Sequence, residues 1–288
     1  MHWLLSGRLS VEKITVKIAD LPVSLAGTKL VQMSDFHDDG KRLSEEMLEQ
    51  AIAITNAAEA DLILLTGDYI TTNPSPIHHL ASRLKNLQSR YGIYAILGNH
   101  DIYYKHPHRK PKTPAPYLGI KPEIIAAFEN IGIHVLWNQI AYPLGEKLPI
   151  IGLADYWSED FQPASVMEKI DPKIPRIVLS HNPDTAEILQ QWRVDLQLSG
   201  HTHGGQIVIP GVGTVIPFYN KAIIKIPRQL RRLIPFFPSS PIKVIQHWEW
   251  TMGLHQVGNN QLYVNRGLGT YAPGRLFCPP EVTIITLL

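Results

Sequence analysis

Five apolar runs of strand length in this chain each end just before residues of the kinds that bind metals. In open α/β sheets, ligands bind beyond the carboxyl ends of the strands, so polar clusters at five strand ends are expected to meet in one place. Because these clusters hold His, Asp and Asn, the pattern predicts a metal site and favours two metals over one. The runs are residues 30–33, 62–65, 94–97, 177–179 and 196–198, and the clusters are residues 35–37, 67–69, 98–101, 180–182 and 200–206.

Helical and strand patterns alternate over most of the chain, and this alternation predicts a largely parallel sheet with helices outside it. Residues beyond 205 are richer in strand signals and predict a second sheet packed on the first. The expected helices are 43–60 (with Ser44 as N-cap), 78–90, 121–131, 164–169 and 184–191, and the expected strands are 11–18 (an edge strand), 62–66, 93–97, 133–137, 149–153, 176–180, 195–198, 206–209, 242–248, 261–265 and 281–287.

Composition narrows the kind of site. The chain has one cysteine, Cys278, which excludes an internal disulfide and a thiolate zinc cluster. The net charge of +2 gives no overall field that would favour nucleic acid, so we expect no nucleic-acid partner. Thirteen histidines are present, and imidazole with carboxylate ligands suits Mn, Fe, Zn or Ni.

Length and hydrophobic content allow one large domain, and we expect a single domain over residues 1–288. It would have a leading strand segment at 1–28 and a basic and apolar insertion at 216–250. The chain shows no signal-peptide h-region, and no apolar run approaches the roughly 18 residues that span a bilayer. We therefore expect a cytoplasmic protein, with peripheral contact at the inner face of the plasma membrane as an alternative. An upstream membrane anchor is left open.

The polar clusters contain ligands for two divalent cations. Asp35 and His37 lie two residues apart beyond a strand, so both side chains can face one metal. Asp68 has two carboxylate oxygens and can bridge two cations. Two such ions would activate a bridging hydroxide and bind the attacking and leaving oxygens of a phosphoryl ester. The other candidate ligands are Asn99, which offers a neutral oxygen, and His181, His201 and His203.

The order Asp-x-His, Gly-Asp, Gly-Asn-His-Asp, His and Gly-His-Thr-His resembles the calcineurin-like metallophosphoesterase family over residues 29–206. The resemblance implies a four-layer α/β/β/α sandwich, in which two mixed sheets are flanked by helices. It implies that His100 assists the leaving oxygen or the transition state without binding metal, and that Asp101 orients His100 through a hydrogen bond. The implied ligands are Asp35, His37, Asp68 and His203 for one metal, and Asp68, Asn99, His181 and His201 for the other.

Later segments resemble a bacterial subgroup of the same family, namely residues 204–206 and 262–270, continued by Arg275 and residues 278–281. Some members of this subgroup hydrolyse the pyrophosphate of UDP-2,3-diacylglucosamine in lipid A synthesis, and others act as phosphodiesterases. Members usually carry a membrane anchor before the first family strand. This chain departs from them there, which weighs against membrane attachment.

Two features leave alternatives open. Residues 221–237 carry five basic and no acidic residues among large apolar ones. They either contact an anionic membrane surface, which we favour, or pack on the domain and leave their cations solvated. Arg266 either binds a substrate phosphate or serves as a structural ion-pair partner. Asp155 and Asp184 are expected in turns or helix caps.

We expect a metal-dependent phosphoric ester hydrolase with two divalent ions, Mn²⁺ first and Fe, Zn or Ni as alternatives. Its substrate would be a phosphodiester or pyrophosphate, with a lipid-linked nucleotide such as UDP-2,3-diacylglucosamine as the specific candidate. The alternatives are a general phosphodiesterase without a lipid substrate and a catalytically silent module that binds lipid or a partner. A silent module is expected to lose ligands, and every ligand is present here, so we rank it last. The sequence predicts no oligomeric state.

Overall fold

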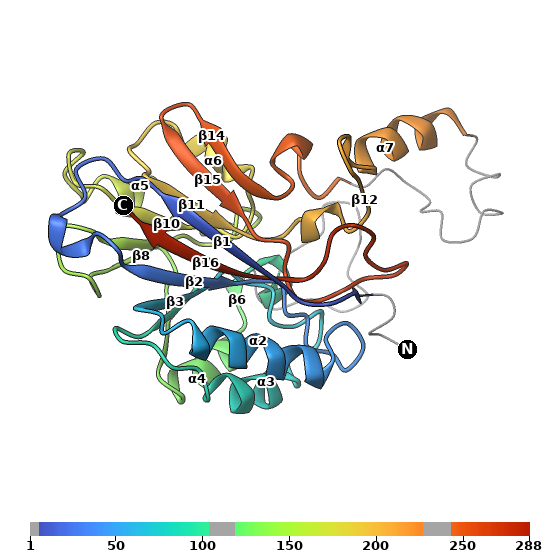
Figure 1. Cartoon of the computed structure of the whole chain (residues 1–288), viewed down its shortest axis with the longest axis horizontal. Helices are drawn as coiled ribbons and strands as arrows, with labels where there is room; N and C mark the ends of the chain where they lie inside the picture. The colour runs from blue at the N-terminus through green and yellow to red at the C-terminus, as the bar shows by residue number, and fades with distance from the viewer. Residues whose placement is uncertain (1–5, 104–118, 227–242) are drawn as a thin grey trace.

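The computed structural model describes residues 6–103, 119–226 and 243–288, which form two large sheets with helices on their outer faces (Figure 1). The first sheet is mixed: β16 and β2 are antiparallel, and the other neighbouring strands are parallel. Its order is β1 (Ser10–Val16), β16 (Glu281–Leu287), β2 (Lys29–Met33), β3 (Leu62–Leu65), β4 (Ile93–Ala95) and β7 (Ile133–Val135).

The second sheet is parallel at its centre and antiparallel at both outer pairs. Its order is β14 (Gly253–Val257), β15 (Asn260–Val264), β11 (Leu196–Ser199), β10 (Ile177–Leu179), β9 (Ile150–Gly152) and β8 (Gln139–Ala141). The expected arrangement of two mixed sheets flanked by helices is confirmed.

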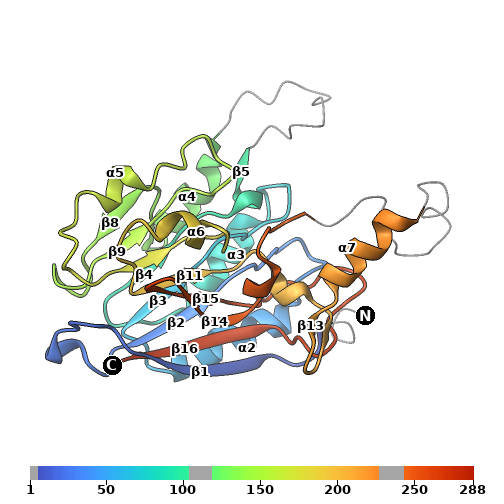
Figure 2. The same ribbon diagram turned by 90° about the horizontal axis from the view of Figure 1, so that it is seen from above.

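Helices cover the outer faces, and most of the expected ones form with shorter bounds. The Oγ of Ser44 accepts a hydrogen bond from the backbone N of Met47, 3.2 Å away, so the expected cap starts the first long helix. No helix in the described residues is long and apolar enough to span a bilayer. The helices are α2 (Glu45–Ala57), α3 (Ile77–Leu84) and α4 (Pro122–Glu129) beside the first sheet, α5 (Ala164–Met167) and α6 (Thr185–Leu189) beside the second, and α7 (Ile216–Lys225), which projects from the body (Figure 2).

The central strands are buried on both faces, which explains why their sequences are apolar without alternation. Within β2 and β3, Leu30, Leu62 and Leu64 join the cluster that reaches the second sheet. Their neighbours Val31 and Ile63 pack toward the helices instead. The strand ends between the two sheets are therefore fixed from both sides, and the polar residues that follow them are held in place.

The division of the strands between the sheets differs from the expectation. The second sheet already begins at β8, and β16 returns to the first sheet between β1 and β2. The strand signal at 206–209 forms only β12 (Val208–Ile209), which pairs with β13 (Gly213–Thr214) in a separate hairpin. The expected strand at 242–248 was wrong for residues 243–248, because β14 already occupies that edge of the second sheet. Residues 227–242 of the expected insertion lie outside the described residues.

Candidate metal centre

Five of the candidate ligands have an unusual backbone conformation. Asp35, His37, Asp68, His201 and His203 all have φ between 47° and 71°, a region that few residues other than glycine occupy. Such conformations persist only where the surrounding structure holds them, and they cluster at functional sites. Here they occur directly after β2, β3 and β11, where the chain must turn sharply at the edges of the sheets.

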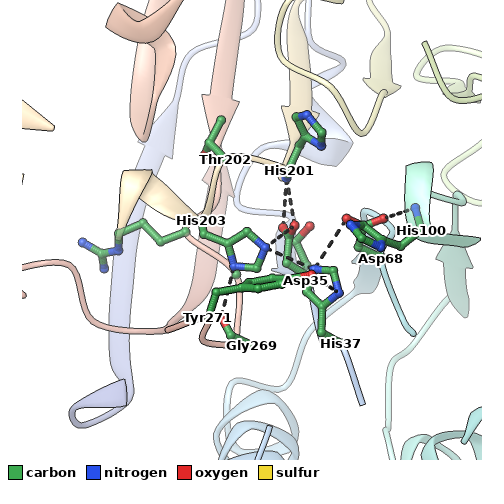
Figure 3. A network of polar contacts seen from close by, with 12 residues as sticks. Asp35, His37, Asp68, His100, His201, Thr202, His203, Gly269 and Tyr271 are labelled. Atoms are coloured by element: carbon green, nitrogen blue, oxygen red, sulfur yellow. Dashed lines mark hydrogen bonds and ion pairs between the residues drawn. The ribbon is translucent and has the colours of Figure 1, made fainter. Parts of the chain in front are cut away.

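The first group of ligands consists of Asp35, His37 and His203, all buried. The Nε2 atoms of the two imidazoles lie 3.1 Å apart, and Nε2 of His203 lies 3.3 Å from Oδ1 of Asp35 (Figure 3). The Nδ1 atoms of His37 and His203 contact the carbonyl oxygens of Ile70 and Gly269, at 3.1 Å and 3.0 Å. Burial lowers the pKa of His37 to about 3 and that of His203 well below its usual value.

These contacts fix the protons on the two rings. A neutral imidazole that donates from Nδ1 has only a lone pair on Nε2. His37 and His203 therefore turn two lone pairs toward each other and toward the carboxylate of Asp35. This arrangement is repulsive unless a cation lies between the three groups, so their donor set fits a divalent metal ion.

The second group contains Asp68, His181 and His201. Nδ1 of His181 contacts the carbonyl oxygen of Thr66 at 2.6 Å. Its Nε2 lies 3.1 Å from Oδ2 of Asp68, and within the described chain this Nε2 makes no hydrogen bond. The buried Oδ1 of Asn99 likewise has no hydrogen-bond partner there. Buried polar atoms without partners are costly, and these two fit the coordination of a cation.

Asp68 lies between the two groups. Its Oδ2 is 3.5 Å from Nε2 of His37 and 3.1 Å from Nε2 of His181, so one oxygen faces both. Burial raises the pKa of Asp68, but His181, His100 and His37 together lower it, and the net pKa lies well below the usual range. For His181, burial lowers the pKa but Asp68 raises it, to about 10. In the absence of a cation, His181 therefore carries a proton beside the Asp68 carboxylate.

His100 and Asp101 are arranged differently from the expectation. Nδ1 of His100 contacts the carbonyl oxygen of Thr71 at 2.5 Å, and its backbone N donates to Oδ1 of Asp68 at 2.9 Å. The Asp101 carboxylate instead accepts hydrogen bonds from the backbone N atoms of Asp68 (2.6 Å) and Tyr69 (3.0 Å). The predicted side-chain bond from Asp101 to His100 was therefore wrong: four amide donors, including those of Ile70 and Gly98, surround the carboxylate.

Arg266 forms ion pairs with two carboxylates of the protein. Its Nη2 lies 2.5 Å from Oε1 of Glu12, and its Nε lies 2.7 Å from Oε2 of Glu281. Both carboxylates hold the guanidinium at the edge of the first sheet, and these contacts favour the structural ion pair over binding of a substrate phosphate.

Two glycines of the motifs are required by close approach to the ligands. A Cβ atom on Gly98 would lie 2.3 Å from Oδ1 of Asp68, and one on Gly200 would lie 2.3 Å from Oδ2 of Asp35. No side chain fits in either place. The glycines of Gly-Asn-His-Asp and Gly-His-Thr-His therefore make room for the carboxylates of the neighbouring strand ends.

Several residues that support the site lie outside the predicted set. The ring of Tyr271 packs edge-on against His37 and His203, and its Oη lies 3.2 Å from Nδ1 of His37. The guanidinium of Arg42 lies 4.3 Å from the centre of the Tyr271 ring. Asp184 is the N-cap residue of α6, as expected, but its carboxylate holds residues 246–247 instead of the amides of the helix. None of these residues stands in a metal-binding motif, so their sequence neighbours give no signal.

Comparison with known proteins agrees with this geometry. The calcineurin-like phosphoesterase family matches residues 28–205. The phosphodiesterase YaeI of Escherichia coli is 30% identical over 96% of this chain and 88% of its own length. The uncharacterized metallophosphoesterase YkuE of Bacillus subtilis is 30% identical over 95% of this chain and 83% of its own.

A third relative, the UDP-2,3-diacylglucosamine pyrophosphatase LpxG of Chlamydia muridarum, is 27% identical over 92% of this chain and 84% of its own length. The matched region contains every strand end that carries a candidate ligand. The chain therefore belongs to the calcineurin-like phosphoesterase family and is a metal-dependent phosphoric ester hydrolase.

Proposed function

We propose that the chain binds two divalent cations and hydrolyses a phosphodiester or a pyrophosphate. The observation that carries the proposal is the pair of lone pairs on the buried rings of His37 and His203, which face each other and the carboxylate of Asp35 with no donor between them. The first cation would be held by Asp35, His37, Asp68 and His203, and the second by Asp68, Asn99, His181 and His201. Because the ligands mix oxygen and imidazole without sulfur, we propose Mn²⁺, with Fe, Zn or Ni as alternatives.

When bound, two such cations lower the pKa of water and stabilise the charge on phosphoryl oxygens. The side chains of this chain set up the rest. Asp68 keeps its negative charge between the two groups of histidines, and it would be a ligand in both sets. His100 is held from Nδ1 by Thr71, so its Nε2 is the atom that would pass a proton to the leaving oxygen. Asp101 fixes the backbone around Asp68.

We propose a lipid-linked nucleotide such as UDP-2,3-diacylglucosamine as the substrate, and peripheral contact with the inner face of the plasma membrane through residues 221–237. The similarity to a pyrophosphatase with this named substrate supports the choice. A general phosphodiesterase is the second candidate, supported by the similarity to the Escherichia coli phosphodiesterase.

We also propose that residues 1–288 form one domain, because β16 inserts between β1 and β2.

The test is hydrolysis of UDP-2,3-diacylglucosamine beside a plain aryl phosphodiester, with Mn²⁺ supplied. Asp68→Ala removes the shared carboxylate and is expected to abolish activity and metal binding together. Asp20→Ala is the matched control, because it removes an exposed carboxylate that pairs with Arg193.

Cleavage of the lipid nucleotide that depends on Asp68 supports the specific substrate. Cleavage of the aryl ester alone would support only the general phosphodiesterase. Near-full activity in Asp68→Ala would show that the dinuclear assignment is wrong.

A further inference from the structure

Six exposed apolar side chains lie on the hairpin of β12 and β13, on α7, which follows the hairpin, and on residues 276–277 beside it. They belong to three segments that backbone hydrogen bonds join: the N of Val208 donates to the O of Leu276 at 3.0 Å, and the N of Val215 donates to the O of Ile207 at 3.1 Å. Between 47% and 68% of each side chain's surface is exposed. We call this set the docking face, and it consists of Ile209 and Val212 on the hairpin, Phe218 and Ile224 on α7, and Leu276 and Phe277.

Phe277 is exposed although aromatic side chains are usually buried, and its backbone has a conformation that bulky residues usually avoid. It is a large aromatic residue with 67% of its surface exposed, and its φ is 52°, in the left-handed region that disfavours bulky side chains. The turn of the hairpin also extends away from the rest of the protein. A Cβ atom added to Gly211 or Gly213 would have no neighbouring atom within 4 Å. Neither feature serves the packing of the fold, which indicates that an external partner covers these residues.

The described residues of the hairpin, α7 and the segment after residue 242 carry cations and no carboxylates. Residues 206–226 and 243–248 contain Lys221, Lys225 and Lys243 and no Asp or Glu, although the whole chain carries 27 basic and 25 acidic residues. On α7, Lys221 and Lys225 are exposed and lie one turn apart beside Phe218. Apolar side chains flanked by cations are typical of surfaces that enter the boundary of an anionic bilayer.

The docking face lies next to the metal centre. Cys278, which follows Phe277, is buried and its Sγ lies 3.5 Å from the carbonyl oxygens of His203 and Gly204. A membrane that contacts Phe277 would therefore lie close to His203, because Cys278, the residue after Phe277, touches the backbone of His203.

We propose that the docking face binds an anionic phospholipid bilayer, with Val212, Phe277 and Phe218 entering the acyl boundary and the lysines of α7 contacting the headgroups. The proposal extends the membrane contact of residues 221–237 to the hairpin and to residues 276–277. It does not depend on the metal chemistry of the proposed function. A second copy of the chain is the competing occupant, and lysines of the same sign facing one another across such an interface would oppose it.

The experiment is sedimentation of the full chain with vesicles of phosphatidylcholine alone and with vesicles of equal phosphatidylcholine and phosphatidylglycerol. We expect binding to the second kind only, weakened by salt. The double variant Val212→Ser, Phe277→Asn removes two exposed apolar groups, and Asn tolerates the left-handed backbone. Its partition onto anionic vesicles is expected to fall about tenfold or more.

Lys221→Gln with Lys225→Gln is expected to lower the same partition by roughly fivefold for each lysine. Val23→Ser is the matched control, because Val23 is exposed and the segment around it lies at the end of the molecule opposite α7 (Figures 1 and 2). Hydrolysis of a soluble aryl phosphodiester is measured on the same samples, so a failure of catalysis and a failure of vesicle binding are separate results.

Vesicle binding that requires phosphatidylglycerol and is lost in the double variant supports the proposal. Three results would overturn it: no sedimentation with anionic vesicles, equal binding by the double variant, or a dimer in sedimentation velocity that Phe277→Asn dissociates.

Discussion

Nε2 of His201 donates a hydrogen bond to the carbonyl oxygen of Val244, 2.9 Å away. Burial lowers the pKa of His201 to about 4, so the ring is neutral and its single proton lies on Nε2. The bond therefore leaves Nδ1 with the lone pair that a metal needs. Val244 lies within the basic and apolar insertion (216–250). Asp184 holds residues 246–247 by accepting hydrogen bonds from the backbone N of Gln246 (2.7 Å) and His247 (3.0 Å).

Asp184→Ala is expected to weaken the second metal site and to spare the first. Without the carboxylate, the backbone of residues 246–247 loses two hydrogen bonds next to Val244, and the orientation of His201 becomes less fixed. Loss of a group that orients a ligand typically costs about 10- to 100-fold in metal affinity. Calorimetric titration with Mn²⁺ would show one weakened site of two, and Glu187→Ala, which removes only a partner of the His247 side chain, should leave both unchanged. Equal weakening of both sites would contradict this role.

His100→Ala is expected to keep both metals and lose turnover. Its Nδ1 is engaged by Thr71, and a group that transfers a proton contributes about 10²- to 10⁴-fold to the rate. The measurement is kcat for an aryl phosphodiester beside the metal content of the same purified sample. An ester with a good leaving group, which needs no proton, should restore most of the lost rate. Loss of metal in the variant would show that His100 is a ligand.

Metal affinity is expected to rise with pH. In the cation-free protein the pKa of His181 is about 10, because burial, which lowers it, is outweighed by Asp68. Below that pH the ring carries a proton that a cation must displace. Each unit by which the pH rises thus increases the apparent affinity for the cation by up to about tenfold, because fewer protons compete for His181. Calorimetry in two buffers with different ionisation enthalpies measures the proton release directly, and binding of Mn²⁺ near neutral pH without proton release would contradict the protonation of His181.

Arg275→Met is expected to destabilise the fold as well as the site. The half-buried guanidinium donates to the carbonyl oxygens of Arg266 (2.8 Å), Gly267 (3.1 Å) and Gly269 (2.7 Å). Each buried carbonyl left without a donor costs about 1 to 3 kcal/mol, so we expect a loss of at least about 3 kcal/mol. Urea unfolding measures it, and Arg275→Lys should recover only part. A loss below about 1 kcal/mol in the Met variant would contradict this account.

Much of the fold could be read from the sequence because its signals are local. Apolar runs without alternation marked strands buried on both faces, and Ser44 marked the start of α2. The division of strands between the sheets could not be read in this way. β16 lies between β1 and β2, and pairing between segments so far apart depends on which sheet edge is free, which no local pattern records.

The sequence by itself determined the residue types of the site and their order after the strands, since Asp, Asn and His at strand ends leave few other chemistries. Tertiary structure decided what those residues contact. Asp101 binds the backbone around Asp68 rather than His100, and Arg266 meets Glu12 and Glu281. The proton positions on His37, His201 and His203 depend on carbonyl oxygens of Ile70, Val244 and Gly269. Every residue has a carbonyl oxygen, so only the folded chain determines which of them faces a ligand.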